Sequence, residues 1–496
     1  MSNIDNQKLL LGIDIGTSSI KFSVVDRELK NYYSNAVKYK YDTLNKDWTE
    51  INPSVWTDII CTELLKVFKM PFSKSIKGIC PTAQMHTLVF LDEKNAPIRK
   101  AIMWNDKRTK NIITDLKVAL GKKMGFKYNA NIVSTGSPLA NLIWLKENEP
   151  NNFKRLKKIC MCKDYINTFL TDKIATDFCD ASVSCLMDLE KGNWSSKICE
   201  YFGIDTGILP NIQKSTEQVG LLKGDICQQL SIKEAIPVFT GTGDNAATVL
   251  ATKYFEKTKL VLSLGTSGVV LTENKHLSLS GKNILFRYLD KEYILAQTSL
   301  STGGKSFDWW VNDVLQATNY NNEQKFSSEK IINNEILFLP YLSGEKYLYK
   351  NPNLTGTFYN LSISDNRFDL NLAVLEGVIF TLKSLYLISN NKEQKIDNLI
   401  LLGGGSKSNV WTNIVANVFN TTVIRFKNSI EAVTGAAIIG LLALHEEICV
   451  HENNEQKVKP KLRFIKHYQK KYKYFCYVSD KINELSSTKK SLSTEI

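Results

Sequence analysis

The chain has 496 residues, more than one compact core normally serves, so its length predicts two large domains or three smaller ones. Hydrophobic residues make up 43% and charged residues 23%, and no uninterrupted apolar run reaches the roughly 18 residues of a membrane span. The first residues lack the basic and apolar stretches of a secretory signal, so we expect a cytoplasmic protein. The net charge of +13 forms no stripe of Lys and Arg among aromatic residues, so neither a nucleic-acid nor a membrane partner is expected.

Cysteine and histidine usage argues against a disulfide framework and a zinc site. The ten cysteines are scattered, and several, such as Cys80 and Cys179, lie in apolar runs that favour reduced core thiols. Cys160 and Cys162 form the single close pair, and the chain has five histidines. This spacing does not predict a zinc site.

An internal repeat is the strongest sign of domain organisation. Residues 10–26 comprise a β-rich run, a Gly-Thr-Ser turn and a second β-rich run, and residues 259–274 repeat this pattern about half a chain later. The repeat predicts two domains of related topology, each opening with a strand, a turn and a strand. We place the boundary near residues 235–240, which gives domains over 1–237 and 238–452 and a C-terminal helix and polar tail over 453–496.

The remaining segments alternate between strand-like and helical patterns. In chain order we expect two strands in 76–92, a helix over 140–148, a buried strand in 334–342, a long packed helix over 367–389, and a strand, glycine turn and helix over 398–420. In the tail, Tyr468, Tyr472 and Phe475 recur at helical spacing, which predicts a last packed helix before a frayed end. This alternation predicts an α/β protein with mixed sheets covered by helices.

The two Gly-Thr-Ser turns are candidate phosphate-binding loops. A tight glycine turn points several backbone N–H groups into one concavity, and such nests bind phosphate oxygens. An ordinary hairpin turn explains either one alone. Together, however, two such turns could clamp the polyphosphate of one nucleotide. The residues concerned are Gly16, Thr17, Ser18, Gly265, Thr266 and Ser267.

Two aspartates are candidates for phosphoryl-transfer chemistry. Asp14 interrupts an apolar strand, where a buried carboxylate needs a cation or strong donors; Mg²⁺ bridging ATP phosphates would serve, and so would a lysine or backbone partner. Asp244 follows a glycine-rich turn and precedes a small-residue helix. It is either a helix N-cap or the general base that takes a proton from an acceptor hydroxyl.

Three further stretches could complete a site. A sugar pocket needs planar hydrogen-bonding groups beside an aromatic face, and two stretches offer both: Gln84, Met85 and His86, then Trp104, Asn105, Asp106 and Arg108. A structural role explains His86 taken alone. The third stretch is the glycine run Gly403–Gly405, which precedes a helix that contains Asn409 and Trp411. A base or ribose could rest against the backbone of these glycines, although a flexible turn explains the glycine run equally well.

In their order along the chain, these motifs resemble the FGGY family of carbohydrate kinases, and within it the xylulokinases. The resemblance runs from about residue 9 to residue 445 through GIDIGTSS, QMH, WNDKR, CKDY, GTGDN, LSLGTSG, FLPYLSGE, LEGV and LLGGGSKSN. It implies two actin-like, ribonuclease H-like ATPase domains with mixed sheets flanked by helices and an interdomain cleft. It also implies ATP and Mg²⁺ as cofactors and a small sugar as substrate.

The resemblance also implies individual roles. Asp244 would be the catalytic base, and Asp14 would be catalytic as the carboxylate associated with Mg²⁺. The implied ligands fall into two groups: substrate-binding Met85, His86, Asp106, Asp244 and Asn245, and ATP-binding Gly16, Thr17, Ser18, Gly265, Thr266, Ser267, Trp309, Gly404, Gly405 and Asn409.

The expected reaction phosphorylates D-xylulose at the 5-hydroxyl to give D-xylulose 5-phosphate and ADP. Departures from the xylulokinase pattern leave the exact sugar open, because Thr87 and Lys107 stand beside the sugar motifs where glycine is common. The alternative substrates are ribulose, gluconate, glycerol or another polyol. A different alternative is a non-catalytic actin-like nucleotide-binding protein, but the presence of Asp14 and Asp244 argues against it. The oligomeric state, including a homodimer, stays open.

Overall fold

The computed structural model describes residues 7–123, 131–274, 277, 282–290, 292–390, 396–428, 430–450 and 455–492. The chain forms two compact units whose segments alternate along the sequence. Unit 1 comprises Met1–Glu256, Lys275–Leu295 and Ile430–Glu452, and unit 2 comprises Lys257–Asn274, Ala296–Ser429 and Asn453–Ile496. Asp244, which the sequence boundary assigned to the second domain, therefore packs within unit 1.

Unit 1 is built on a mixed sheet in which β1 is central. The strand order is β14 (Gln218–Leu221), β15 (Pro237–Phe239), β6 (Ile76–Ala83), β1 (Leu9–Ile15), β2 (Ser19–Val25) and β3 (Asn31–Lys38), and β16 (Thr242–Gly243) also pairs with β6. Strand β1 is antiparallel to β2 and parallel to β6. Every residue of β1 is buried, as its nearly continuous apolar sequence predicts for a central strand.

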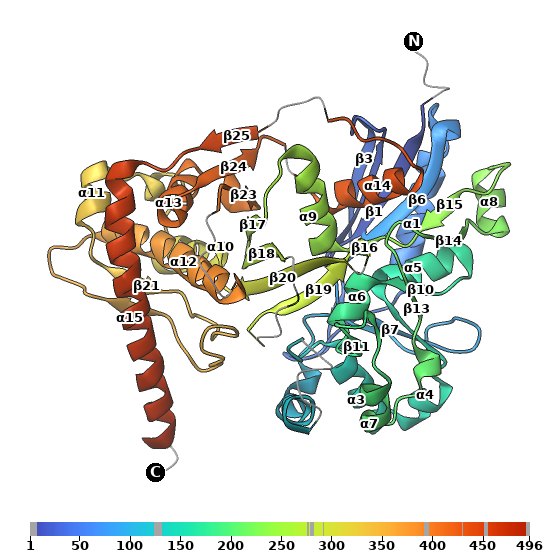
Figure 1. The fold of residues 1–496 in the computed structure, drawn as a ribbon, viewed down its shortest axis with the longest axis horizontal. Helices are drawn as coiled ribbons and strands as arrows, with labels where there is room; N and C mark the ends of the chain where they lie inside the picture. Colours follow the sequence, from blue (N-terminus) through green and yellow to red (C-terminus); the bar gives the residue numbers. More distant parts are fainter. Residues whose placement is uncertain are drawn as a thin grey trace. The chain divides into compact units, whose positions relative to one another are not determined.

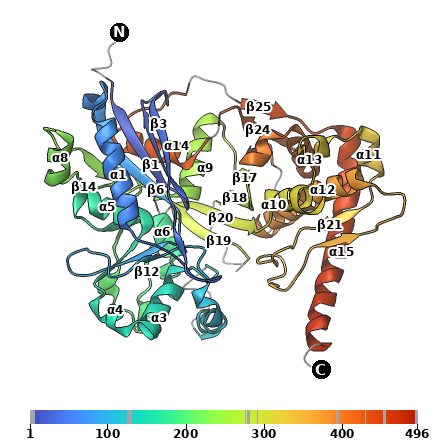
Figure 2. The same ribbon diagram turned by 180° about the vertical axis from the view of Figure 1, so that it is seen from behind.

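Helices cover both faces of this sheet. Figure 2 shows α1 (Ser54–Val67) in front of the strands, and Figure 1 shows α14 (Ala432–Ala443) on the opposite face. Side chains alternate along a strand, so the odd-numbered residues of β1 join the core that contains Trp56 of α1. The even-numbered residues face α14: a Cβ on Gly12 would lie 2.6 Å from the carbonyl oxygen of Val433. Asp14 shares that second face.

Helix α9 (Asp244–Phe255) packs closely against α14. A Cβ on Gly435 of α14 would lie 1.9 Å from the carbonyl oxygen of Ala247 of α9, so only glycine permits this approach. Helix α14, which comes late in the chain, thus packs together with the strands from the start of the chain (Figure 1).

A second part of unit 1 contains a smaller sheet with its own core. The strand order is β4 (Asp42–Thr43), β5 (Thr49–Ile51), β8 (Ala101–Ile102), β7 (Leu88–Leu91) and β9 (Lys158–Met161). Helix α3 (Pro138–Asn148) packs against it through Leu139, Leu142 and Leu145. The strands predicted in 76–92 and the helix predicted over 140–148 are thus confirmed.

Unit 2 repeats the arrangement around β1. Its strands follow the order β20 (Tyr293–Leu300), β18 (Gly268–Asn274), β17 (Leu260–Leu264), β23 (Asn398–Leu402), β24 (Thr422–Phe426) and β25 (Glu455–Val458). Strand β17 is antiparallel to β18 and parallel to β23, as β1 is to β2 and β6. Three residues separate the strands in each hairpin, 16–18 and 265–267. The predicted repeat is therefore a structural one.

Three helices dominate unit 2: α12 (Arg367–Asn390), α13 (Asn409–Phe419) and α15 (Leu462–Leu492). Residues Arg367–Ser389 are long and apolar enough to cross a membrane, but 78% of that window is buried, so α12 is a core helix. In α15, Tyr468 and Phe475 are buried against Phe380 of α12, which confirms the predicted packed helix. The predicted frayed end includes 493–496, outside the described residues.

The remaining elements are short. The other helices are α2 (Ile113–Val118), α4 (Pro150–Arg155), α5 (Cys162–Thr171), α6 (Phe178–Val183), α7 (Ser196–Phe202), α8 (Gly224–Leu230), α10 (Gly304–Trp309) and α11 (Ser328–Asn333). The other strands are β10 (Ala175–Asp177), β11 (Met187–Asp188), β12 (Asn193–Trp194), β13 (Asn211–Gln213), β19 (Ile284–Tyr288), β21 (Leu337–Leu339) and β22 (Thr357–Tyr359). All ten cysteines are free thiols, as the sequence predicts.

Candidate functional site

Asp14 lies near the end of β1, on the face of the sheet that α14 covers. It pairs with Lys21 of β2 and with Thr82 of β6 in the strand register. The residue is 7% exposed, and its Oδ1 atom is buried without a hydrogen-bond partner in the described structure. The Lys21 amine forms its ion pair with Glu431 at 2.9 Å.

Asp244 is the first residue of α9, directly after the strand β16 that pairs with the end of β6. Its Oδ1 accepts a hydrogen bond from the backbone N–H of Asn245 at 2.7 Å. Gly243, rather than Asp244, is the N-cap, so the N-cap alternative does not describe this residue. The residue as a whole is partly exposed, whereas Asp14 is buried.

The two carboxylates share an electrostatic environment. Burial, and then the charge of Asp244, raise the pKa of Asp14 to about 7, which the positive charge of Lys21 partly opposes. Burial also raises the pKa of Asp244 to about 6, against the effect of the Asn245 N–H donor. A carboxyl group with a pKa near neutrality can exchange a proton at physiological pH. Such a pair, one of them with an orphaned oxygen, is a candidate catalytic site.

The orphaned oxygen of Asp14 also fits a cation. Among the described residues, no group of three or more His, Cys, Asp or Glu side chains could enclose a metal ion. A divalent cation at Asp14 would therefore take most of its ligands from water and phosphate, which is how proteins usually hold Mg²⁺. The donor set is consistent with Mg²⁺ delivered together with a nucleotide.

The first glycine turn, residues 16–18, lies directly after Asp14. The Gly16 N–H donates to the carbonyl oxygen of Ser19 at 3.0 Å, and the Tyr39 hydroxyl donates to the carbonyl oxygen of Gly16. The Thr17 hydroxyl accepts a hydrogen bond from the indole Nε1–H of Trp104 at 3.0 Å. Ser18 is exposed. The turn is thus fixed in place while its outer surface stays open to a ligand.

The predicted sugar residues Met85 and His86 lie between β6 and β7, beside Asp244. The Asn245 side-chain amide contacts the Met85 sulfur at 3.9 Å, which brings together two of the predicted substrate residues. His86 is partly exposed and has a φ of +68°, an uncommon backbone conformation for a non-glycine residue. Strained positions of this kind concentrate at functional sites.

Asp106 occupies a different environment from the other predicted sugar residues. It is 1% exposed, and both of its carboxylate oxygens accept hydrogen bonds from the Arg108 guanidinium at 2.9 Å. The backbone N–H of Thr49 donates to Oδ2 at 2.6 Å. With its acceptor sites used in this way, Asp106 orients the neighbouring loop, whereas Trp104 of the same motif is 46% exposed and open to a ligand.

In unit 2 the second glycine turn meets the start of α10. The Gly265 N–H donates to the carbonyl oxygen of Ser267 at 3.0 Å, and the carbonyl oxygen of Gly265 accepts from Gly304 N–H at 2.8 Å. The Thr266 carbonyl oxygen accepts from Lys305 N–H at 3.1 Å. Trp309, a predicted nucleotide neighbour, is the last residue of α10 and is partly exposed.

The glycine run lies against the same turn. Gly403 has a φ of +81°, and a Cβ there would lie 2.6 Å from the carbonyl oxygen of Leu264, just before the turn. A Cβ on Gly405 would lie 2.4 Å from the Leu264 side chain, whereas Gly404 has nothing within 4 Å of its Cβ position. Gly404 therefore offers open space at the backbone, as a flat ligand would require.

Asn409, the first residue of α13, completes this group. Its Oδ1 accepts a hydrogen bond from the Arg425 guanidinium at 2.5 Å. It also lines a pocket of about 520 Å³ within unit 2, in the size range typical of small-molecule sites. The predicted ATP-binding residues of unit 2 thus lie around adjoining loops, and those of unit 1 lie at the turn after Asp14.

Sequence reasoning missed the residues that hold these loops. Tyr39, which fixes the first turn, lies in a β-rich stretch with no motif. Lys163, Asp164 and Asp177 form a buried ion cluster beneath Thr242. The CKDY motif, residues 162–165, is the only signal of that cluster in the sequence, because the other participants are distant along the chain.

Comparison with known families and structures identifies the family of the chain. Residues 9–251 match the N-terminal domain of the FGGY family of carbohydrate kinases, and residues 260–444 match its C-terminal domain. The chain is 32% identical to the xylulose kinase of Lactococcus lactis subsp. lactis over 421 residues, covering 84% of each protein. It is 31% identical to the xylulose kinase of Staphylococcus xylosus, covering 87% of this chain and 90% of that protein.

Solved structures share the fold over nearly the whole chain. A protein named xyloylose kinase from Brucella ovis is 25% identical, with a TM-score of 0.89 and coverage of 96% of this chain and 100% of that one. A gluconate kinase from Lactobacillus acidophilus (22% identity, TM-score 0.87, coverage 96% and 99%) and a glycerol kinase from Plasmodium falciparum (20%, 0.84, coverage 96% and 98%) have the same fold. The chain belongs to the FGGY family of carbohydrate kinases and is an ATP-dependent sugar kinase.

Proposed function

We propose that the chain transfers the γ-phosphoryl group of Mg·ATP to the 5-hydroxyl of D-xylulose, giving D-xylulose 5-phosphate and ADP, in cytoplasmic xylose metabolism. The observation that carries the proposal is the position of Asp244, whose raised pKa of about 6 and partial exposure suit a general base. It lies next to Asn245, which contacts Met85 of the predicted sugar site. The relatives' names support xylulose as the sugar.

In the proposed reaction the residues of unit 1 bind the sugar and accept its proton. Met85, His86 and Asn245 hold the ketose with its 5-hydroxyl directed at Asp244. As the oxygen–phosphorus bond forms, the hydroxyl proton passes to the Asp244 carboxylate and the bond between the γ-phosphorus and the bridging oxygen of ATP breaks, releasing ADP. Mg²⁺ held at Asp14 would neutralise charge on the phosphates.

The proposed nucleotide contacts of unit 2 are the turn at 265–267, Gly404 and Asn409. Backbone N–H groups and hydroxyls of a glycine turn suit phosphate oxygens, and the open space at Gly404 suits a ribose or base. The turn at 16–18 in unit 1 is the second proposed phosphate contact. In-line transfer requires the γ-phosphate to reach the hydroxyl beside Asp244.

The two departures that stand beside the sugar motifs, Thr87 and Lys107, have structural explanations. Thr87 is fully buried, and its hydroxyl accepts a hydrogen bond from the backbone N–H of Trp104 at 3.2 Å. Lys107 is exposed, and its backbone N–H donates to the carbonyl oxygen of Asp47. Thr87 thus fixes the loop that carries Trp104, and Lys107 extends into solvent.

The decisive test is ADP formation with Mg·ATP across D-xylulose, D-ribulose, gluconate, glycerol and related polyols. We expect the highest kcat/KM for D-xylulose, and phosphorus–proton NMR of the product should place phosphate on C5. A higher kcat/KM for another acceptor would replace xylulose with that sugar. Failure of every acceptor to stimulate ADP release would favour the non-catalytic alternative.

A further inference from the structure

The four residues before Asp244 are held from several directions. The Thr240 carbonyl oxygen accepts from the Asn167 side chain at 2.9 Å, and the Gly241 N–H donates to the Ser215 carbonyl oxygen at 3.0 Å. The Thr242 carbonyl oxygen accepts from the Thr82 hydroxyl at 2.6 Å. Every one of these bonds joins the segment 240–243 to a different part of unit 1, so its backbone has little freedom.

Glycines let this segment lie against its neighbours. Gly241 has a φ of +70°, and a Cβ there would lie 1.7 Å from the carbonyl oxygen of Pro81. A Cβ on Gly243 would lie 2.6 Å from Cγ of Met85, a predicted sugar ligand. The segment is therefore packed between strand β6 and the residues that precede His86, and any shift of it would move Asp244.

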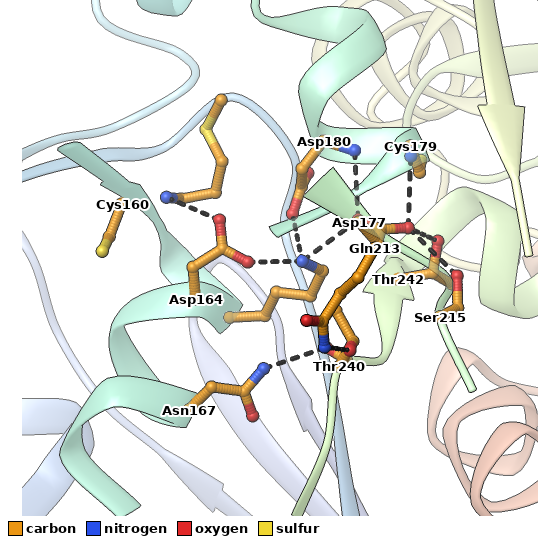
Figure 3. A network of polar contacts seen from close by, with 12 residues as sticks. Cys160, Asp164, Asn167, Asp177, Cys179, Asp180, Gln213, Ser215, Thr240 and Thr242 are labelled. Atoms are coloured by element: carbon orange, nitrogen blue, oxygen red, sulfur yellow. Dashed lines mark hydrogen bonds and ion pairs between the residues drawn. The ribbon is translucent and has the colours of Figure 1, made fainter. Parts of the chain in front are cut away.

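Asp177 is the centre of the side-chain contacts to this segment (Figure 3). Its Oδ2 accepts hydrogen bonds from the Thr242 hydroxyl at 2.6 Å and from the Ser215 hydroxyl at 3.2 Å. The backbone N–H of Cys179 also donates to Oδ2 at 3.2 Å, and the backbone N–H of Asp180 donates to Oδ1 at 3.2 Å. The bond to Thr242 is the shortest of the four, and it connects Asp177 to the residue two positions before Asp244.

Lys163 orients Asp177 from the other side. Its ammonium group is 3.0 Å from Oδ1 of Asp177, 2.5 Å from Asp164 and 3.2 Å from Asp180, and its side chain is fully buried. An ammonium has three N–H donors, so each can serve one carboxylate. Burying three carboxylates around one lysine costs desolvation energy, which burying apolar side chains would not cost. Such clusters therefore contribute little to the stability of the fold. A role in orientation accounts better for their presence next to a catalytic loop.

We propose that Asp177, oriented by Lys163, is a positioning residue that sets the place of the Asp244 carboxylate through the Thr242 hydroxyl. The inference rests on Asp244 acting as the base. Displacing a reacting group by about 1 Å can cost on the order of 100-fold in rate, so a fixed Thr242 matters for kcat more than for binding. The hydroxyl of Thr242 is fully buried and donates directly to Asp177, so it links the cluster to the loop through a side chain of the loop itself.

The test compares Thr242→Val with Thr242→Ser. Valine keeps the branched shape and removes the donor, whereas serine keeps the donor and removes the methyl group. We expect kcat of Thr242→Val to fall about 10- to 100-fold while KM for the sugar changes less than threefold, and serine to restore kcat to within about threefold of the parent. Circular dichroism and thermal melting of each variant verify folding before kinetics.

Ser215→Ala is the matched control, because it removes a donor to the same Asp177 oxygen without altering residues 240–244. We expect it to lower the melting temperature and to leave kcat within about twofold. Equal losses of kcat in Thr242→Val and Ser215→Ala, or a normal kcat in a folded Thr242→Val, would overturn the proposal. Should the valine variant not fold, Asp177→Asn tests the same link: kcat within threefold in that folded variant would also overturn it.

The outcome is separable from the proposed function. If Asp244→Asn is inactive while Thr242→Val is normal, the positioning role fails and the kinase mechanism stands. If Asp244→Asn is itself active, the base assignment fails first, and any effect at Thr242 then has a different cause.

Discussion

The charge of Asp244 raises the pKa of Asp14, although the two residues belong to distant parts of the sequence. Three adjacent parallel strands explain their proximity. Asp14 of β1 pairs with Thr82 of β6, and Thr82 pairs with Thr242 of β16, so the ends of the three strands coincide. The sheet register therefore places a candidate metal ligand and a candidate base at one edge.

We predict that Asp14→Asn stabilises the ligand-free protein at pH 8. The carboxyl of Asp14 has a pKa of about 7 in the folded protein and an ordinary pKa of 3.8, so it releases its proton more easily when the chain is unfolded, and stability falls as pH rises from about 4 to about 7. A rise of the pKa from 3.8 to about 7 corresponds to a loss of stability of at most about 4 kcal/mol. Urea unfolding should show a gain of about 2–4 kcal/mol at pH 8.

The same comparison at pH 4 provides the control. There the carboxyl of Asp14 is protonated in the folded protein, so asparagine replaces a neutral group and the gain should shrink to below about 1 kcal/mol. An equal gain at both pH values, or a loss at pH 8, would contradict the assignment of Asp14 as a buried carboxyl group with a raised pKa.

We predict an acid limb in the pH profile of kcat/KM for the sugar at saturating Mg·ATP. The base must be ionised to accept a proton, and burial raises the pKa of Asp244 to about 6. The rate should therefore fall tenfold per pH unit below about 6. Because Asp14 and Asp244 interact, the apparent value belongs to the pair. A profile that is flat from pH 5 to pH 8 would contradict the general-base role.

We predict opposite outcomes for alanine at two neighbouring glycines. The added Cβ of Gly404→Ala meets no atom within 4 Å, so the variant should keep the fold. If the nucleotide rests against this backbone, KM for ATP should rise about tenfold, and KM for the sugar should not change. Gly403→Ala requires a left-handed conformation and a contact of 2.6 Å with the Leu264 carbonyl oxygen, and should cost about 2–4 kcal/mol.

Steady-state kinetics and thermal melting distinguish these effects. A Gly404→Ala variant with normal KM for ATP would show that the nucleotide does not approach this backbone. Gly403→Ala with an unchanged melting temperature would contradict the close packing of the glycine run on β17.

The sequence predicted the strand–turn–strand repeat, and with it the fold, because local β propensity and glycine turns determine hairpins. It also identified Asp14 as a polar residue in an apolar strand. It did not reveal that α14 returns to pack on β1, because that contact depends on Gly12 of β1 and Gly440 of α14, which carry no local signal. Nor could it show that Asp106 is committed to Arg108, because hydrogen-bond saturation depends on partners such as the Thr49 N–H.

The most direct test of the central claim is the kcat of Asp244→Asn with Mg·ATP and D-xylulose. Asparagine has the same size and keeps an oxygen for the Asn245 N–H, but it cannot accept the proton. Asp172→Asn, at a side chain 69% exposed in unit 1, is the matched control and should retain normal activity. We predict a loss of kcat of about 100- to 10,000-fold in Asp244→Asn with sugar affinity kept within a few-fold; a folded Asp244→Asn with kcat within tenfold of the parent would contradict the account.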